Sequence, residues 1–418
     1  PPLSKGFLTG RQAPADFTFA KADALHEVGI DFRPGMRVEA VDRRVGLDVQ
    51  RVEQIRGHAP NLGLTPDRGR YDPSRMTRYL VTSAGPKSPA TDPRLLAFAR
   101  DTFFPGLFDR FHDATARHAF WYGNFEGEFG DADRGHSRWE TFPAEARFGT
   151  TCIGLRGRLS VLVESYSYAP YKDRVLGSLA FCRAVLEAAD ARRDTIRDLA
   201  EHPDRPARVA IRSKAAPHEG QTTILGFKET TANGRSTSTG EPQDYPVQLW
   251  DRFEPTLEVD VPEAYALVSP SAKVESTLRA HGLTVARVSA DAECDAEIQT
   301  ITDAKSASRQ FQGHALVTLE TSTRREKTRL PRGTLLIPTN QPLGRLAVYL
   351  LEPRSEDGLA TWNFFDEAIK PGQDFPVLRL PSGTPLPTAR VTEPNATANP
   401  GPPPTDPRRE PPASPHLE

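Results

Sequence analysis

One segment restricts the possible folds more than any other: a run of branched apolar residues followed by a helical pattern. Leu159-Ser160-Val161-Leu162-Val163 has the composition of a strand buried on both faces. From Tyr171 to about Ala191 the apolar spacing becomes helical. The predicted apolar stripe of that helix consists of Val175, Leu179, Cys182 and Leu186. A buried strand leading into an amphipathic helix favours an α/β fold.

The preceding residues support the same fold class. Tyr79-Leu80-Val81-Thr82 predicts a short strand, and Asp92-Pro93 predicts a helix start with Asp92 as the N-cap. The apolar side of this helix continues around Pro105 as far as Phe111. We therefore expect a mixed-sheet α/β domain over residues 1–204.

The second half of the chain predicts a different architecture. The α/β pattern breaks at residues 201–206, and a helix is predicted from Ser271 to Gly282. Strands are predicted at residues 207–211, 223–227, 247–250, 264–268, 283–288, 315–319, 334–337 and 346–351. These elements predict a β-rich α+β domain over residues 205–384.

Two further stretches differ from the rest in composition. Residues 385–418 hold 11 of the 39 prolines and few large apolar groups, which predicts a disordered Pro-rich tail. Residues 23–77 contain no lysine and many arginines, and we assign them no secondary structure. Whether residues 23–77 are native-like or an out-of-frame stretch of a gene is left open.

The balance of charge argues against two kinds of partner. Lys plus Arg number 53 against 55 Asp plus Glu, a formal charge of −2, which gives no general electrostatic reason to bind nucleic acid or an anionic membrane. No apolar run approaches the roughly 18 residues of a membrane span. The three cysteines predict no disulfide scaffold. Pro1 is followed by no leader pattern, so either a leader was removed or the chain begins inside a longer protein.

Glu164 follows the predicted buried strand directly, and a carboxylate in that place is costly to desolvate. Sites in open α/β sheets form beyond the carboxyl ends of strands, so Glu164 is a candidate general base. The alternative is that Glu164 leaves the strand and forms a salt bridge with a surface arginine.

A resemblance to a known family bears on this choice. Residues 148–168, Phe-Gly-Thr-Thr-Cys-Ile-Gly-Leu-Arg-Gly-Arg-Leu-Ser-Val-Leu-Val-Glu-Ser-Tyr-Ser-Tyr, resemble the segment that carries the catalytic glutamate in zinc carboxypeptidases of the carboxypeptidase A type. The resemblance is greater to a bacterial branch with an appended C-terminal domain, and residues 309–314, 341–353 and 358–366 also resemble that branch. It implies a carboxypeptidase-like domain, incomplete in this chain, and a β-rich accessory domain.

The resemblance also implies roles for particular residues. Glu164 matches the glutamate that moves the proton of the attacking water. Arg51, in Gly46-Leu47-Asp48-Val49-Gln50-Arg51, matches the arginine that binds the terminal carboxylate of the substrate, with Gln50 where the family often has Asn. Tyr122 is the candidate for the family's substrate-binding tyrosine, and Tyr166 and Tyr168 are alternatives. An exposed Arg51 without function, or aromatic residues that only pack, are the competing interpretations.

The family's zinc ion is expected on a His-x-x-Glu pair and a later His, but no such pair occurs here. The segment from His136 to Glu140 is one residue too long. His58 is the only histidine between Arg51 and Tyr79, and a solvated loop histidine is the alternative to a ligand there. The sequence therefore implies Zn²⁺ as cofactor without locating its ligands.

The expected function is that of a zinc metallocarboxypeptidase hydrolysing C-terminal peptide bonds of a peptide substrate, with little or no activity in this chain. One alternative is a non-catalytic peptide- or glycan-binding protein that retains the fold. Another is a structural protein whose residues 207–380 dock a partner. A secreted or periplasmic location is implied by the family only.

Overall fold

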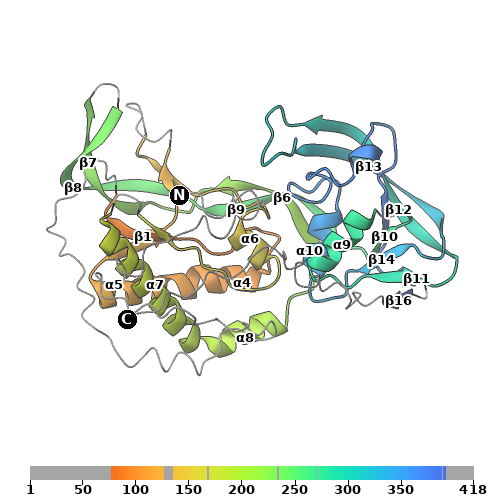
Figure 1. Ribbon diagram of the computed structural model, residues 1–418, viewed down its shortest axis with the longest axis horizontal. Coiled ribbons are helices and arrows are strands. Elements are labelled where there is room, and N and C mark those ends of the chain that lie inside the picture. Colours follow the sequence, from red (N-terminus) through yellow and green to blue (C-terminus); the bar gives the residue numbers. More distant parts are fainter. Residues whose placement is uncertain are drawn as a thin grey trace, which may run out of the picture. The chain divides into compact units, whose positions relative to one another are not determined.

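The computed structural model describes residues 77–126, 135–166, 169–232, 235–269, 271–387 and 389–391. The described chain forms two compact units, shown in Figure 1. The first unit comprises the described residues up to Asp204 together with Ser213–Thr256, and the second comprises Arg205–Arg212 and the residues from Leu257 onward. The chain passes between the units after Asp204 and again within strands β6 (Arg208–Ala216) and β9 (Arg252–Asp260), which pair with each other. Domains 1–204 and 205–384 stay a prediction.

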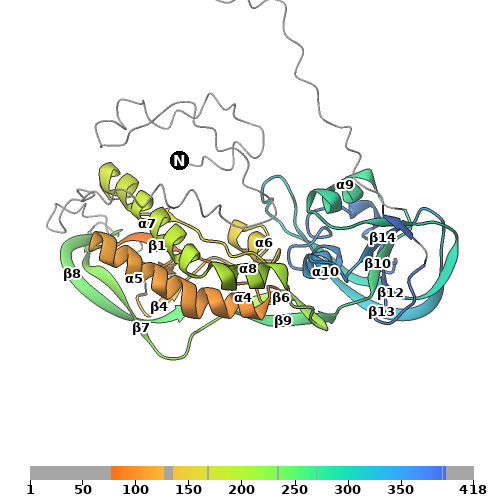
Figure 2. The same cartoon turned by 90° about the horizontal axis from the view of Figure 1, so that it is seen from below.

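A small mixed sheet organises the first unit. Its central strand β1 (Tyr79–Ser83) runs parallel to β2 (His118–Trp121) and antiparallel to β5 (Glu164–Ser165). Helices α5 (Phe104–Thr115) and α7 (Tyr171–Ala191) contact each other and this sheet, and both are visible in Figure 2. The mixture of parallel and antiparallel strands with covering helices agrees with the expected α/β class.

The helix expected after Asp92 is confirmed, including its start. Helix α4 (Pro93–Ala97) has Asp92 as N-cap, and the Asp92 side chain accepts a hydrogen bond from the Arg94 backbone N–H. A π-helical segment, η2 (Phe98–Phe103), joins α4 to α5. The apolar side of these helices supplies the core of the unit, in which Phe104, Leu107, Phe111 and Phe181 are fully buried.

The expected strand over Leu159–Val163 is wrong. These residues are irregular, and only Glu164–Ser165 pairs with β1. Two hydroxyl groups hold the segment in place: Ser160 donates to the Thr150 carbonyl over 2.9 Å, and Ser83 donates to the Leu162 carbonyl over 2.5 Å. An apolar run therefore packs on the core here without joining a strand ladder.

The expected apolar stripe of α7 is also wrong, although the helix itself is confirmed. Leu179 and Cys182 are exposed, and the buried face carries Leu176, Gly177, Ala180, Phe181, Ala184 and Ala188. Small residues on that face let the helix approach the sheet closely, because a Cβ at Gly177 would lie 2.6 Å from Leu80 Cδ2. No helix among the described residues is both long and apolar enough to cross a membrane.

A second sheet in the first unit has the order β3–β4–β8–β7. Its strands are β3 (Asn124–Phe125), β4 (Arg138–Glu140), β7 (Thr222–Ala232) and β8 (Arg235–Trp250). Strand β4 runs parallel to β8, and β7 forms an antiparallel hairpin with β8. Phe125, Trp139, Ile224 and Val247 form its core with Tyr79 of β1. The remaining helices of the unit are α6 (Gly149–Gly154) and α8 (Arg193–Glu201).

The second unit contains a seven-stranded sheet of order β13–β12–β15–β10–β14–β11–β16. The strands are β10 (Ala264–Leu267), β11 (Ala286–Val288), β12 (Ala292–Ser306), β13 (Val317–Leu330), β14 (Leu335–Pro338), β15 (Val377–Leu380) and β16 (Ala389–Val391). The helical elements are α9 (Ala272–Ala280), α10 (Gly344–Leu351) and η3 (Asp366–Ala368). This unit is β-rich, as expected; an accessory role for it stays a prediction.

Two expectations for this region need correction. Residues 346–351 form helix α10 and not a strand, and all six are buried. Within the predicted tail over residues 385–418, residues Ala389–Val391 form β16, which pairs with β11. Residues 392–418 lie outside the described residues, as do residues 23–76 of the Arg-rich stretch.

Candidate functional site

The structure describes two of the four predicted site residues. Glu164 is the first residue of β5 and lies opposite Thr82 in the β1–β5 pair. Its side chain is exposed, so the burial expected for a general base is not found. Arg51 and Gln50 lie outside the described residues, as does His58.

The end of β1 brings Tyr122 close to Glu164. The backbone N–H of Tyr122 donates to the Ser83 carbonyl over 2.8 Å, one residue after the Thr82–Glu164 pair. Burial, and then the negative charge of Glu164, raise the pKa of Tyr122, whereas a hydrogen bond with Asn124 lowers it. Tyr122 therefore keeps its proton over the neutral range and can donate a hydrogen bond beside a carboxyl group that accepts one.

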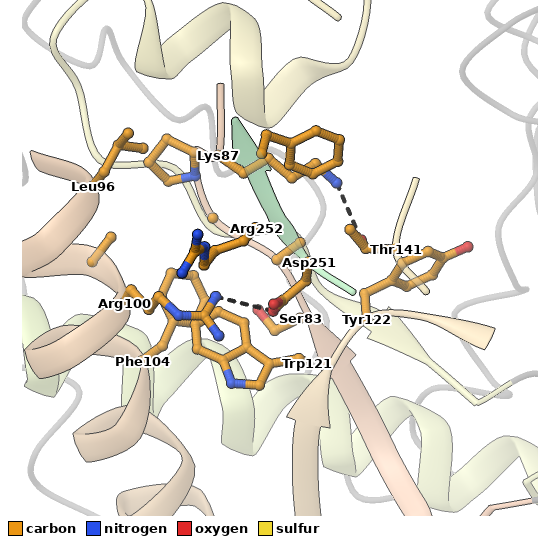
Figure 3. A pocket seen from close by; sticks show the side chains of 15 residues that line it. Ser83, Lys87, Leu96, Arg100, Phe104, Trp121, Tyr122, Thr141, Asp251 and Arg252 are labelled. Carbon is orange, nitrogen blue, oxygen red and sulfur yellow. Dashed lines mark hydrogen bonds and ion pairs between the residues drawn. The ribbon is translucent and has the colours of Figure 1, made fainter. Parts of the chain in front are cut away.

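A cavity of about 120 Å³ lies next to this pair, and Tyr122 is part of its wall (Figure 3). It is lined by Ser83, Ala84, Gly85, Pro86, Lys87, Leu96, Ala99, Arg100, Phe104, Trp121, Tyr122, Thr141, Asp251, Arg252 and Phe253. The lining begins where β1 ends, which is the place where α/β sheets commonly carry sites. The strand predicted at residues 79–82 is the sequence signal that points to this place.

Arg100 and Asp251 line the cavity and form a charged network with His218, which lies behind them. Arg100 Nη1 donates to Asp251 Oδ2 over 3.1 Å, and His218 Nε2 lies 2.7 Å from Asp251 Oδ1. Arg100 Nη2 is 3.4 Å from His218 Nδ1. His218 thus bridges the Arg100 guanidinium on one side of its ring and the Asp251 carboxylate on the other.

The network fixes the charge of Asp251. Burial alone would raise the pKa of this carboxyl, but the hydrogen bond from His218 and the charge of Arg100 outweigh burial and hold the pKa below its usual value. Arg100 also lies over the Trp121 ring, 5.1 Å from its centroid. Asp251 is therefore ionised and paired with Arg100, and Lys87 and Arg252 are the other basic side chains that line the cavity.

Lys87 lies in a poorly solvated place, and its Nζ donates to Thr141 Oγ1 over 3.1 Å (Figure 3). Burial lowers the pKa of Lys87 to about 6, against a smaller opposite effect of Asp251 and Glu145. Nζ also lies 2.9 Å from the centroid of the Phe142 ring. A cation–π contact of about 0.5–2 kcal/mol would raise the pKa by at most about 1.5, less than burial lowers it. The neutral fraction of this amine at pH 7 is therefore much larger than that of an exposed lysine.

The described residues contain no group of three or more His, Cys, Asp or Glu side chains arranged to hold a metal ion. His136, the nearest approach to a ligand motif in the sequence, bonds to Glu229 Oε1 over 3.0 Å and stacks on Tyr245. A zinc site with three protein ligands would need at least one ligand from outside the described ranges.

Comparison with known proteins gives a distant relationship. The chain is similar to Carboxypeptidase 2 of Trichophyton rubrum, at 23% identity over 242 residues, which are 56% of this chain and 44% of that protein. The match thus spans less than half the length of that relative. No family model matches the chain, and no solved structure matches it significantly. The similarity supports a carboxypeptidase-like relationship; kinship with the bacterial branch stays a prediction.

Proposed function

We propose that this protein is a carboxypeptidase-like hydrolase that acts on the C-terminal peptide bond of a peptide substrate. The observation that carries the proposal is the similarity of 242 residues to a carboxypeptidase. The geometry that supports it is the position of Glu164 and Tyr122 beside the same end of β1, next to a cavity.

In this proposal Glu164 accepts a proton from the attacking water and returns it to the leaving amine. Its exposed place at the sheet edge allows a water molecule and a peptide to reach it. Tyr122, which keeps its proton, donates a hydrogen bond to the bound peptide. Arg51, with Gln50 before it, is proposed to bind the terminal carboxylate; both positions lie outside the described residues.

Zinc is part of the proposal as an expectation from the resemblance. The part of the chain that the structure describes supplies no metal-binding group for it. Metal analysis of the 418-residue chain after dialysis against zinc tests this part, and one zinc per chain is the result expected for a complete site.

The proposed role of Glu164 is tested with the variant Glu164→Gln in the full chain. Removing the carboxylate should lower turnover of a peptide with a free C-terminus by at least about 10²-fold while peptide affinity changes little. Glu201→Gln is the matched control, because Glu201 is an exposed glutamate on α8, and it should leave turnover unchanged. Release of the C-terminal amino acid is the readout for turnover, and fluorescence anisotropy of a labelled peptide is the readout for binding.

The absence of a His-x-x-Glu pair predicts slow turnover in this chain, so binding is measured even where hydrolysis is not detected. Peptide binding that needs the free C-terminal carboxylate, without hydrolysis in the presence of zinc, would overturn hydrolysis and favour the peptide-binding alternative. Equal turnover in the Glu164→Gln and wild-type chains would overturn the role of Glu164.

A further inference from the structure

The cavity holds a lysine that the proposed peptidase chemistry does not use. Lys87 and Thr141 both line the cavity, and the Lys87 amine donates to the Thr141 hydroxyl oxygen over 3.1 Å. Apart from Arg100, Asp251 and Arg252, the lining is largely apolar, and Leu96, Phe104 and Trp121 contribute to it (Figure 3). An amine on such a wall has an apolar space beside it of a size suited to a small organic molecule.

We propose that Lys87 is a nucleophile toward small apolar aldehydes that enter this cavity, and that it binds them covalently as imines. The Lys87 nitrogen attacks the carbonyl carbon, a C–N bond forms, and the π pair of the carbonyl moves to oxygen. A proton passes from nitrogen to that oxygen and gives a carbinolamine. Loss of the hydroxyl group with a proton, as water, leaves the C=N bond, and water reverses the sequence.

The hydrogen bond to Thr141 gives the amine a defined orientation. One N–H points at Thr141 Oγ1, and the face of the Phe142 ring, 2.9 Å from Nζ at its centroid, accepts a second N–H. When both N–H groups of a neutral amine are engaged in this way, its lone pair points away from Thr141 and from the Phe142 ring. Thr141 is therefore a positioning residue for the attack.

The charge state of Lys87 favours attack at neutral pH. With a pKa of about 6 in place of 10.5, the neutral fraction at pH 7 is about 10³-fold larger than that of an exposed lysine. A less basic amine is also a weaker nucleophile, by about 10²-fold if it follows the trend known for thiols. The net expectation is a rate about tenfold above that of an exposed lysine. Burial lowers the pKa of Lys87 and the charges of Asp251 and Glu145 oppose it; Arg100 and Arg252 are the other charged groups that line the cavity.

The test treats the full wild-type chain with butanal and cyanoborohydride, which reduces the imine to a stable secondary amine. Peptide mass spectrometry, after cleavage by a protease that does not cut at lysine, measures the alkylation rate of each lysine. Lys172, exposed on α7, is the internal reference. At pH 7 we expect Lys87 to react about tenfold faster than Lys172, with a midpoint near pH 6 in its pH profile. Equal rates, or a Lys87 rate that keeps rising to pH 10 with that of Lys172, would overturn the proposal.

Two further measurements test whether the reactivity of Lys87 depends on its place in the cavity or only on the accessibility of its amine. With pyrene carboxaldehyde, which is too large for the cavity, the preference for Lys87 over Lys172 should disappear; an unchanged preference would contradict binding in the cavity. Thr141→Val should slow alkylation of Lys87 about fivefold, the value of one neutral hydrogen bond, and Thr141→Ser should restore it. Equal rates of Lys87 alkylation in the Thr141→Val and Thr141→Ser variants would contradict the positioning role of Thr141. Because these measurements do not involve peptide turnover, their failure leaves the proposed function untouched.

Discussion

Arg379 in the second unit is buried and bonds to two acidic side chains. Its Nη1 donates to Glu352 Oε1 over 2.6 Å, and its Nε donates to Glu297 Oε2 over 3.1 Å. Tyr265 donates its hydroxyl proton to the same Glu352 oxygen over 2.7 Å. Burial, followed by the charge of Glu352, raises the pKa of Tyr265 well above 10, so this proton stays in place. Glu352 therefore compensates the buried charge of Arg379 and also accepts a hydrogen bond from the buried Tyr265 hydroxyl.

We predict that Glu352→Gln destabilises the second unit by about 3–5 kcal/mol, because it leaves the Arg379 charge less compensated inside the protein. Glu293→Gln, at an exposed position of β12, should change stability by less than about 0.5 kcal/mol. Urea unfolding, with hydrogen exchange read on β10 and β15, measures both variants. A loss below about 1 kcal/mol for Glu352→Gln would mean that Glu297 alone suffices for Arg379.

Lys87 predicts a pH dependence of stability in the first unit. Its pKa is about 6 in the folded protein and 10.5 when exposed, so between these values the unfolded chain binds the proton more readily. The free energy of unfolding should therefore rise as pH rises from about 6 to about 10. Lys87→Met removes this effect and should stabilise the unit by about 4 kcal/mol at pH 7 but only about 1 kcal/mol at pH 10. Urea unfolding at both pH values checks this, with Lys172→Met, expected to follow the wild type, as control.

At the scale of elements, α5 and α7 are joined by aromatic packing. Phe111 and Phe181 are both fully buried, and their rings meet edge to face with centroids 5.4 Å apart. Phe181→Ala should destabilise the first unit by about 3–5 kcal/mol because it leaves a cavity between the helices. Leu179→Ala, on the exposed side of the same helix, should cost less than about 1 kcal/mol. Thermal unfolding of the two variants compares them, and similar losses would contradict the assigned buried face of α7.

Several elements were predictable from the sequence because local chemistry determines them. Asp92 and Pro93 specify a helix start whatever the tertiary contacts, and Ser271 does the same for α9, where its side chain accepts from the Val274 N–H. Residues 346–351 were not predictable, since an apolar run buried on all sides has no period that separates helix from strand. The face of α7 was missed because glycine and alanine, and not the larger residues, mark its contact with the sheet.

The candidate site also contains features that local sequence does not determine, here at the level of single residues. The positions of Glu164 and Tyr122 beside β1 depend on strand pairing between distant segments, which no local pattern specifies. Asp251 is 164 residues beyond Lys87 in the chain, yet both line one cavity. The exposure of Glu164 follows from its place on a two-residue edge strand, whereas the sequence had placed it after a long interior one.

At the scale of the whole molecule, three clusters of buried apolar residues among the described residues each draw their members from one unit. Two clusters belong to the first unit and are built on the small mixed sheet and on the β3–β4–β8–β7 sheet. A third belongs to the seven-stranded sheet of the second unit. The two units therefore have separate sources of stability, and we expect Phe181→Ala and Glu352→Gln to act independently.

The return of the chain to the first unit at Ser213–Thr256 has a consequence for how its gene can be divided. A fragment that stops at Asp204 would lose the β7–β8 hairpin, and with it the partners of Phe125 and Trp139. It would also lose Asp251 and His218, which hold Arg100 at the cavity. A gene fragment that is to encode the complete first unit must therefore extend through the codon of Thr256.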